Sequence, residues 1–260
     1  MKVVIIGSGN TATVLGHKML EAGHRIVQVV SRQKEHAARL AAMLKSTYTT
    51  GREAIDPSAE LYLLAVPDDV LYELGEVLSL PGKLVAHTAG TVSKEVLQKV
   101  SKRSGVLYPL QSLRKEIRPF PEIPFLVDAH EPGDRVLLME FARTMSGQVV
   151  EADDGLRLKL HLAAVLVNNF TNFLYTLAAD FCRREGTDFA LLLPIIKETA
   201  DRLGWYAPRE VQTGPAIRGD KTSVERHLSL LANYEDIKEL YSLFTNKIEA
   251  YYQRKEFPPS

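Results

Sequence analysis

A glycine-rich turn near the N-terminus is the first segment whose residue types and spacing suggest chemistry. Residues 3–6 are apolar and favour a buried strand, and residues 13–20 favour a helix. Small residues between a strand and a helix let the backbone approach a pyrophosphate, whose charge then lies at the helix N-terminus. We expect this turn to bind a dinucleotide; a turn that binds nothing is the alternative. It comprises Gly7, Ser8, Gly9, Asn10, Thr11 and Ala12.

The end of the second predicted strand, Arg25–Val30, bears on which dinucleotide would bind. An NAD site usually has an acidic residue here, about 20 residues past the glycines, that binds the ribose 2′-hydroxyl. This chain has Ser31 and Arg32 instead, followed by Lys34 and His36. A guanidinium can pair with a phosphate through two hydrogen bonds, so we expect NADP, with NAD less favoured. The alternative is a solvated turn in which Arg32 stacks on the adenine of either coenzyme.

Two further strand ends are expected at the carboxyl edge of the sheet, where ligands of open α/β sheets bind. We expect them to lie near the nicotinamide half of the coenzyme. Two alternatives remain open: Asp68 or Asp69 only caps the next helix, and His87 is a hydrogen-bonded structural histidine. The residues predicted to contact the coenzyme here are Val66, Pro67, His87, Thr88 and Ala89.

Polar side chains on a long apolar helix are candidates for proton transfer. On a helix, His161, Asn168 and Asn172 lie within about 40° of one stripe, and Asn169 lies roughly 80° from His161. An imidazole can donate a proton, and an asparagine can orient a substrate or a nicotinamide amide. We predict His161 as the proton donor and Asn169 as the orienting residue. A polar network between helices or at a subunit interface is the alternative.

A later loop, residues 205–221, contains the third candidate. Glycines and prolines restrict its shape, and we predict that Arg218 binds a carboxylate or phosphate of the substrate. The alternative is a structural loop in which Asp220 or Thr222 caps the following helix. The histidines are scattered without the spacing of metal ligands, so we expect no bound metal.

The elements that must position these residues change character near Ala152. Strand-like and helix-like segments alternate before it, which predicts a parallel sheet with crossover helices. Only helical patterns follow, beginning with a helix of roughly 30 residues that ends before Gly186. We therefore predict a dinucleotide-binding domain over residues 1–152 and a helical substrate or dimerisation domain over residues 153–260. Besides the segments already named, we predict strands at 61–66, 83–87, 105–108, 124–127 and 148–151, and helices at 33–44, 70–78, 93–102, 134–145, 188–203, 224–232 and 235–253.

Composition limits the classes of partner. The chain has 260 residues, and 32 basic side chains balance 32 acidic ones, which does not favour nucleic-acid binding. Its one cysteine, Cys182, excludes an internal disulfide and fits the cytoplasm. We expect no signal peptide and no apolar run near the roughly 18 residues of a membrane helix.

Several motifs together resemble a bacterial family in which a Rossmann-like domain joins a helical domain of unknown function, number 2520. The resemblance implies an α/β fold, a Rossmann-type doubly wound, mostly parallel sheet, followed by an all-α C-terminal domain that mediates homodimers. The architecture is similar to pyrroline-5-carboxylate reductase, ketopantoate reductase and the 6-phosphogluconate dehydrogenase group. The motifs are the glycine-rich turn and residues 65–69, 87–90, 108–112, 161–165, 169–170, 213–215 and 218–220.

The chain departs from these relatives at two positions. The β-hydroxyacid dehydrogenases pair a catalytic lysine with an asparagine four residues later, whereas Lys159 is followed there by Ala163. Many members of the resembled family have His-Pro where this chain has Tyr108 and Pro109. We predict an NADP-dependent oxidoreductase that transfers a hydride between nicotinamide and a small C=O or C=N substrate. The alternative is a non-catalytic NADP(H) sensor or interaction protein.

Overall fold

The structure, a computed structural model, describes residues 1–253 and contains two compact units, Met1–Thr171 and Asn172–Ser260. Each unit is considered by itself.

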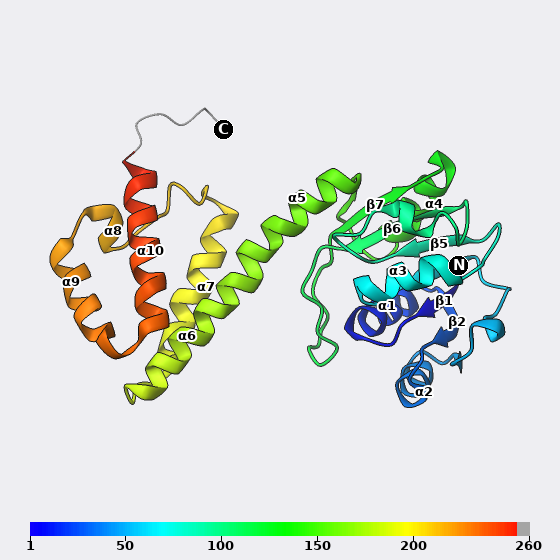
Figure 1. Ribbon diagram of the computed structural model, residues 1–260, viewed down its shortest axis with the longest axis horizontal. Helices are drawn as coiled ribbons and strands as arrows, with labels where there is room; N and C mark the ends of the chain where they lie inside the picture. The colour runs from blue at the N-terminus through cyan, green and yellow to red at the C-terminus, as the bar shows by residue number, and fades with distance from the viewer. Residues whose placement is uncertain (254–260) are drawn as a thin grey trace. The chain divides into compact units, whose positions relative to one another are not determined.

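The first unit is built on an eight-stranded sheet with the order β3-β2-β1-β4-β5-β6-β7-β8 (Figure 1). All strand pairs are parallel except β6 with β7. The order reverses at β1, which places a crevice at the carboxyl ends of β1 and β4. The strands are β1 (Lys2–Ile6), β2 (Arg25–Val30), β3 (Thr47–Thr49), β4 (Leu61–Leu64), β5 (Leu84–His87), β6 (Ser104–Pro109), β7 (Phe125–Ala129) and β8 (Val149–Glu151).

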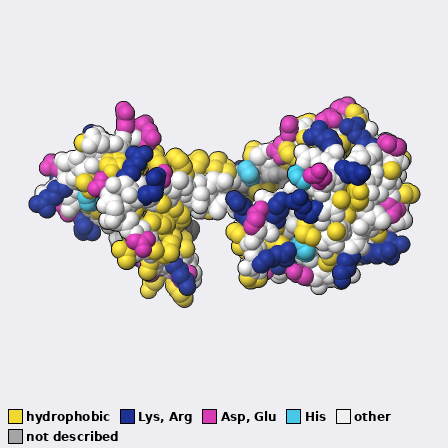
Figure 2. Space-filling model, turned by 90° about the horizontal axis from the view of Figure 1, so that it is seen from below, with side chains coloured by type: hydrophobic (Ala, Val, Ile, Leu, Met, Phe, Trp, Pro, Cys, Tyr) yellow, Lys and Arg dark blue, Asp and Glu magenta, His cyan; other side chains and the backbone are white. Residues whose placement is uncertain are grey.

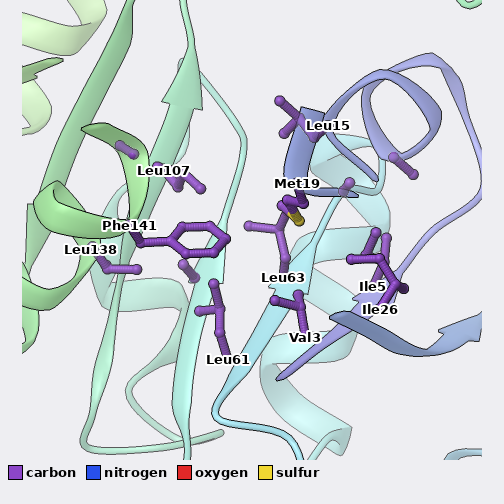
Figure 3. Packing of buried hydrophobic residues seen from close by; sticks show 14 of the residues in the cluster. Val3, Ile5, Leu15, Met19, Ile26, Leu61, Leu63, Leu107, Leu138 and Phe141 are labelled. Carbon is purple, nitrogen blue, oxygen red and sulfur yellow. The ribbon is translucent and has the colours of Figure 1, made fainter. Parts of the chain in front are cut away.

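Both faces of the sheet are covered, which explains why its central strands are continuous apolar runs. Alternate residues of β1 enter different cores: Val3 and Ile5 join one cluster, and Val4 and Ile6 join the other. The first cluster, part of which is drawn in Figure 3, also contains residues of helices α1 (Asn10–Glu21) and α4 (Pro132–Arg143). Residues of α2 (Lys34–Met43) belong to the same cluster, and residues of α3 (Asp68–Val77) and the turn η2 (Lys94–Leu97) belong to the second.

The long predicted helix is present but interrupted. It consists of α5 (Asp154–Ala164), a π-helical segment η3 (Val165–Phe170) and α6 (Thr171–Arg184). Single π turns inside α-helices occur frequently at functional sites. Strands end and only helices follow after Glu151, which is where the sequence predicted the change, near Ala152. The two compact units divide later in the chain, after Thr171. The start of the helix belongs to the first unit, where Arg157 hydrogen-bonds to Val92 in the loop after β5 and His161 hydrogen-bonds to Tyr108 of β6.

The second unit is helical and has few fully buried apolar side chains. Among its described residues only Cys182, Ala216 and Leu231 are buried hydrophobics. Much of its apolar surface is therefore uncovered in the single chain, as the hydrophobic side chains in Figure 2 show. After α6 its elements are η4 (Phe189–Leu192), α7 (Leu193–Asp201), η5 (Arg202–Gly204), α8 (Pro215–Arg218), α9 (Lys221–Leu230), η6 (Leu231–Asn233) and α10 (Glu235–Tyr252).

The structure differs from the sequence predictions at three places. The helix predicted at 93–102 is only the turn η2, because the chain beyond it bonds to the segment before β5: Leu80 N–H donates to Val100 O at 2.9 Å, and Ser101 Oγ donates to Lys83 O at 2.6 Å. The helix predicted at 188–203 is present over residues 189–204, but only α7 is α-helical, and η4 and η5 on either side of it are 3-10 turns. The edge strand β3 was missed because three residues are too few to show a period.

The prediction that no segment reaches membrane length also needs correction. The helix Asp154–Arg184 has 31 residues and is long and apolar enough, by length and composition alone, to cross a membrane. The core helix of a soluble protein can pass the same test, but the apolar window of this helix is not buried within the chain. The apolar side chains in this window are therefore not covered by the rest of the chain.

Candidate active site

The glycine-rich turn connects β1 to α1 and leaves the helix N-terminus open. Gly7 has a φ of +123°, and a Cβ there would lie 2.1 Å from Ala65 O, so only glycine fits. A Cβ on Gly9 would meet no protein atom within 4 Å. Gly9 is the N-cap of α1, no side chain of the described residues caps the first N–H groups of the helix, and the first turn contains no acid. Free N–H groups and a positive helix end are what an anion binds.

A cavity of about 260 Å³ extends from this turn along the carboxyl ends of β1, β2 and β4. Seven of the predicted coenzyme residues line it: Gly7, Ser8, Gly9, Ser31, Arg32, Val66 and Pro67. Ser8 Oγ and Ser31 Oγ are 2.8 Å apart, which ties the turn to the end of β2. Val70, Leu74 and Leu78 form an apolar part of the wall that suits a planar ring.

Sequence reasoning missed the other charged residues of this cavity. Arg52 and Glu73 also line it, and Arg52 Nη2 lies 3.0 Å from Glu73 Oε1. Arg32 Nη1 lies 4.0 Å from the same carboxylate, with the Arg32 side chain 73% exposed. Such exposed pairs are weak, so Glu73 leaves Arg32 free to turn toward a phosphate.

The remaining predicted coenzyme residues do not line the cavity. Asn10, Thr11 and Ala12 form the first turn of α1, and Ala12 is fully buried. Thr88 and Ala89 follow β5, and Thr88 N–H donates to Leu64 O at 3.1 Å. Their contact with the coenzyme stays a prediction.

The loops after β4 and β5 are joined by a hydrogen bond. Thr91 Oγ1 donates to Asp68 Oδ2 at 2.5 Å, and no side chain caps α3, whose N-cap is Pro67. The alternative reading of Asp68 or Asp69 as a side-chain cap was therefore wrong.

His87 is fully buried, which favours the alternative of a structural histidine. Its Nδ1 accepts a hydrogen bond from Ala89 N–H at 3.2 Å and so fixes the backbone after β5. Burial, and next the positive charge of Arg157, lower the pKa of His87 to about 3, although the Ser93 backbone and Asp154 act in the opposite direction. The imidazole is therefore neutral at physiological pH.

The low pKa of His87 predicts acid sensitivity of the fold. Above pH 6.5 His87 is neutral in both states and contributes nothing. Below that pH the unfolded state gains a proton that the folded state does not take up until about pH 3, so the free energy of unfolding falls by about 1.4 kcal/mol per pH unit. The loss reaches about 2 kcal/mol at pH 5.

Urea unfolding of wild type and His87→Asn at pH 7.5 and pH 5 measures this effect. The asparagine Oδ1 can replace Nδ1 as the acceptor but does not titrate. The variant is expected to lose about 2 kcal/mol less than wild type between the two pH values. An identical pH dependence of both proteins would contradict the assignment.

Tyr108 and His161 form a hydrogen-bonded pair within the first unit. Tyr108 Oη lies 2.9 Å from His161 Nδ1, which joins the end of β6 to α5. Burial, opposed by the charge of Arg157, raises the pKa of Tyr108, so its phenol is neutral. Gly90 makes room for the pair, because a Cβ there would lie 2.6 Å from His161 Nδ1 and 3.0 Å from Tyr108 Cζ. Three separate segments therefore meet at one imidazole.

A cavity of about 520 Å³ opens at this pair and has the size of a small-molecule site. Tyr108 and His161 are the only described lining residues with an ionisable side chain. Of the predicted residues, Asn168 and Asn169 of the π segment line it, whereas Asn172 belongs to the second unit. Sequence reasoning did not assign Gln111 and Ser112, although both belong to a motif that carried the family resemblance.

Arg157 is a buried cation beneath this region. Its side chain is 1% exposed, and its Nη2 donates to Val92 O at 2.5 Å and to Asp154 Oδ1 at 2.7 Å. Burial by itself would raise the pKa of Asp154, but hydrogen bonds from Ser93, Arg157 and Lys94 lower it, so the carboxylate stays charged. The pair fastens α5 to the loop after β5 and thereby positions His161.

Arg218 is not part of the first unit. It is the last residue of α8, is exposed, and precedes Gly219, whose φ is +65°. The next residue, Asp220, caps α9 by accepting from Ser223 N–H at 3.0 Å. Anion binding by Arg218 stays a prediction. Within residues 1–253 no group of three His, Cys, Asp or Glu side chains could hold a metal ion.

Comparison with known families divides the chain into two matched regions. Residues 2–89 match the family described as NADP oxidoreductase, coenzyme F420-dependent, and residues 123–248 match the domain of unknown function DUF2520. A comparison with curated proteins finds no match.

Solved structures extend the likeness over the whole chain. A candidate NADP oxidoreductase from Bacteroides fragilis is 38% identical, with a TM-score of 0.87, over 96% of this chain and 98% of its own. A reductive aminase from Aspergillus terreus, in complex with NADPH and ethyl levulinate, is 17% identical with a TM-score of 0.70 over 96% and 94%. The 1-pyrroline-5-carboxylate reductase from Streptococcus pyogenes is 13% identical with a TM-score of 0.65 over 96% and 98%. The last two likenesses show the fold alone.

Proposed function

We propose that this chain, which belongs to the family of NADP-dependent oxidoreductases that carry a DUF2520 domain, reduces a small C=N or C=O substrate. The observation that carries the proposal is the Tyr108–His161 pair at the wall of a small-molecule cavity. The names of the structurally similar reductive aminase and pyrroline carboxylate reductase make C=N the first bond to test.

The residues at the carboxyl edge of the sheet fit NADP. Gly7 and Gly9 present bare backbone at an uncapped helix N-terminus, which suits the pyrophosphate. Ser31 and Arg32 suit the 2′-phosphate, because Arg32 offers a fork of donors and no carboxylate ends β2. When bound, NADPH supplies the hydride.

His161 supplies the proton that reduction also requires. In its protonated form the imidazole donates from Nδ1 to Tyr108 Oη, which fixes the ring and leaves the Nε2 proton for the substrate. After transfer the neutral ring keeps its Nδ1 proton and the same hydrogen bond. Tyr108 can serve as the acceptor throughout because its raised pKa keeps the phenol neutral. Asn169 and Asn168 provide amides that orient an uncharged polar group of the substrate.

The decisive experiment is a coenzyme titration followed by a substrate screen. We expect NADPH to bind more tightly than NADH in a fluorescence titration. A panel of cyclic imines, and of ketones with added amines, is then tested for loss of NADPH absorbance. Tight NADPH binding without turnover of any imine, ketone or keto acid would favour the sensor; failure to bind either coenzyme would contradict both functions.

We also propose that two copies of the chain associate through the long helix. Apolar side chains recur along it at intervals of three or four residues and are more than half exposed in the single chain. They are Leu162, Leu166, Phe170 and Phe173, with exposures of 60, 53, 57 and 55%. A second copy of the same helix would cover such a stripe without a membrane.

Replacing Leu162 and Leu166 together with glutamate is expected to convert a dimer into a monomer. Burying two carboxylates without partners in an apolar interface costs several kcal/mol of the free energy of association. We expect a loss of this size to separate the two copies. Light scattering during size-exclusion chromatography measures the mass. Val136→Glu, on the exposed face of α4, is the control and should stay dimeric. A monomeric wild type, or one that co-sediments with lipid vesicles, would contradict the dimer.

A further inference from the structure

A second cavity borders the glycine-rich turn and is unusually cationic. Its volume is about 200 Å³, and Ser8 is the one residue that it shares with the coenzyme cavity described above. Its wall comes from the turn and α1, from α2, and from the loop between β6 and β7, residues 110–124. The lining residues are Ser8, Thr13, His36, Arg39, Leu40, Met43, Lys115 and Arg118.

The charges at this cavity are of one sign. Arg39, Lys115 and Arg118 are cations, and the lining contains no carboxylate. The two acids of the β6–β7 loop do not line the cavity. Glu116 Oε2 lies 3.6 Å from Arg114 Nε, and Glu122 Oε1 accepts a hydrogen bond from Ser146 Oγ at 2.8 Å. Like charges gathered from two separate segments repel each other, so an anionic ligand is the simplest compensation.

The β6–β7 loop is anchored, so its cations are held near the turn. Leu113 and Phe120 are partly buried against the main core and flank both cations. The guanidinium carbon of Arg118 lies 3.8 Å from the centre of the Phe120 ring, an arrangement that restrains the side chain. The pKa of His17, on α1, is lowered first by burial and then by the positive charge of Arg118. The Arg118 charge therefore acts on α1 as well.

The position of the cavity identifies the anion. Ser8 lines it and also hydrogen-bonds to Ser31, at the end of β2, where a dinucleotide fold binds the 2′ group of the ribose. A phosphate monoester there carries nearly two charges and oxygens for several donors. We infer that Lys115 and Arg118 of the β6–β7 loop, together with Arg32, bind the 2′-phosphate of NADP and so help the protein select NADP over NAD. This inference rests on the proposed coenzyme binding.

The double variant Lys115→Ala/Arg118→Ala tests the inference through coenzyme affinity. We expect the Kd for NADPH to rise at least about tenfold, because two charge-assisted contacts are lost, while the Kd for NADH changes less than about twofold. The affinity for 2′,5′-ADP, which carries the 2′-phosphate, should fall in the same way, and the affinity for 5′-AMP, which lacks it, should not. Neither ligand contains the nicotinamide half. The salt dependence of NADPH binding should also become shallower. Arg114→Ala, in the same loop but outside the cavity, is the matched control and should keep both affinities.

The possible outcomes are separable. Two outcomes in the double variant would overturn the inference: an unchanged affinity for NADPH, or equal losses of affinity for NADPH and NADH. Either outcome would leave the proposed function intact. A selective loss for NADPH and 2′,5′-ADP supports it. A wild type that binds neither coenzyme would contradict the proposed function itself. Circular dichroism and thermal unfolding of each variant establish that the fold is retained.

Discussion

Gly9→Ala is expected to weaken NADPH binding at least about tenfold while leaving the protein folded, a difference of about 1.4 kcal/mol or more in binding free energy. The reason is that a Cβ at this position meets no protein atom within 4 Å and projects where backbone would approach the pyrophosphate. The φ of −82° is accessible to alanine, so the free energy of unfolding should change by less than about 1 kcal/mol. Titration calorimetry and urea unfolding measure the two quantities.

Gly7→Ala is the informative counterpart, because here the protein itself occupies the space. The new Cβ would lie 2.1 Å from a backbone oxygen, at a φ of +123° that alanine rarely adopts. We expect a destabilisation of at least about 3 kcal/mol, together with loss of coenzyme binding. If Gly9→Ala were equally destabilising, or bound NADPH as wild type does, the pyrophosphate would not lie against this turn.

His161→Ala is expected to lower kcat at least about 100-fold with any substrate found in the screen, because a positioned acid contributes 10² to 10⁴ in rate. The affinity for NADPH should not change, since His161 lines only the substrate-sized cavity and not the coenzyme cavity. Stopped-flow measurement of NADPH oxidation separates the chemical step from coenzyme binding. Turnover equal to wild type would remove His161 as the proton donor.

Two further variants distinguish a catalytic imidazole from a structural one. Tyr108→Phe removes the acceptor of the Nδ1 proton but keeps the ring, so kcat should fall by a smaller factor, about tenfold. Gly90→Ala leaves both side chains in place but drives a Cβ to 2.6 Å from His161 Nδ1. It should lower kcat and keep NADPH binding. Loss of coenzyme affinity in either variant would indicate a general disturbance of the fold.

The nucleotide half of the fold could be predicted because its signals are local. Strands buried on both faces must be apolar at every residue, and residues 3–6 and 61–64 show this directly. The glycine-rich turn is likewise local, because the backbone geometry of one short turn requires residues such as Gly7. Two short elements, β3 and the turn η1 (Arg52–Ala54), were missed there because three residues are too few to show a period. The helix expected after Ser93 was wrong because tertiary hydrogen bonds hold that segment.

The amino-acid sequence by itself determined the order of elements, the coenzyme turn and the residue types available for chemistry. Only the tertiary structure decided which of those residues come together: Tyr108 bonds to His161, and Lys115 and Arg39 line one cavity. It also made Arg157 a buried structural cation, whereas an arginine on a helix is usually solvated. The physical reason is that helix and strand patterns are set by neighbours along the chain, whereas a proton donor, its partner and a phosphate site are assembled by packing between segments far apart in it.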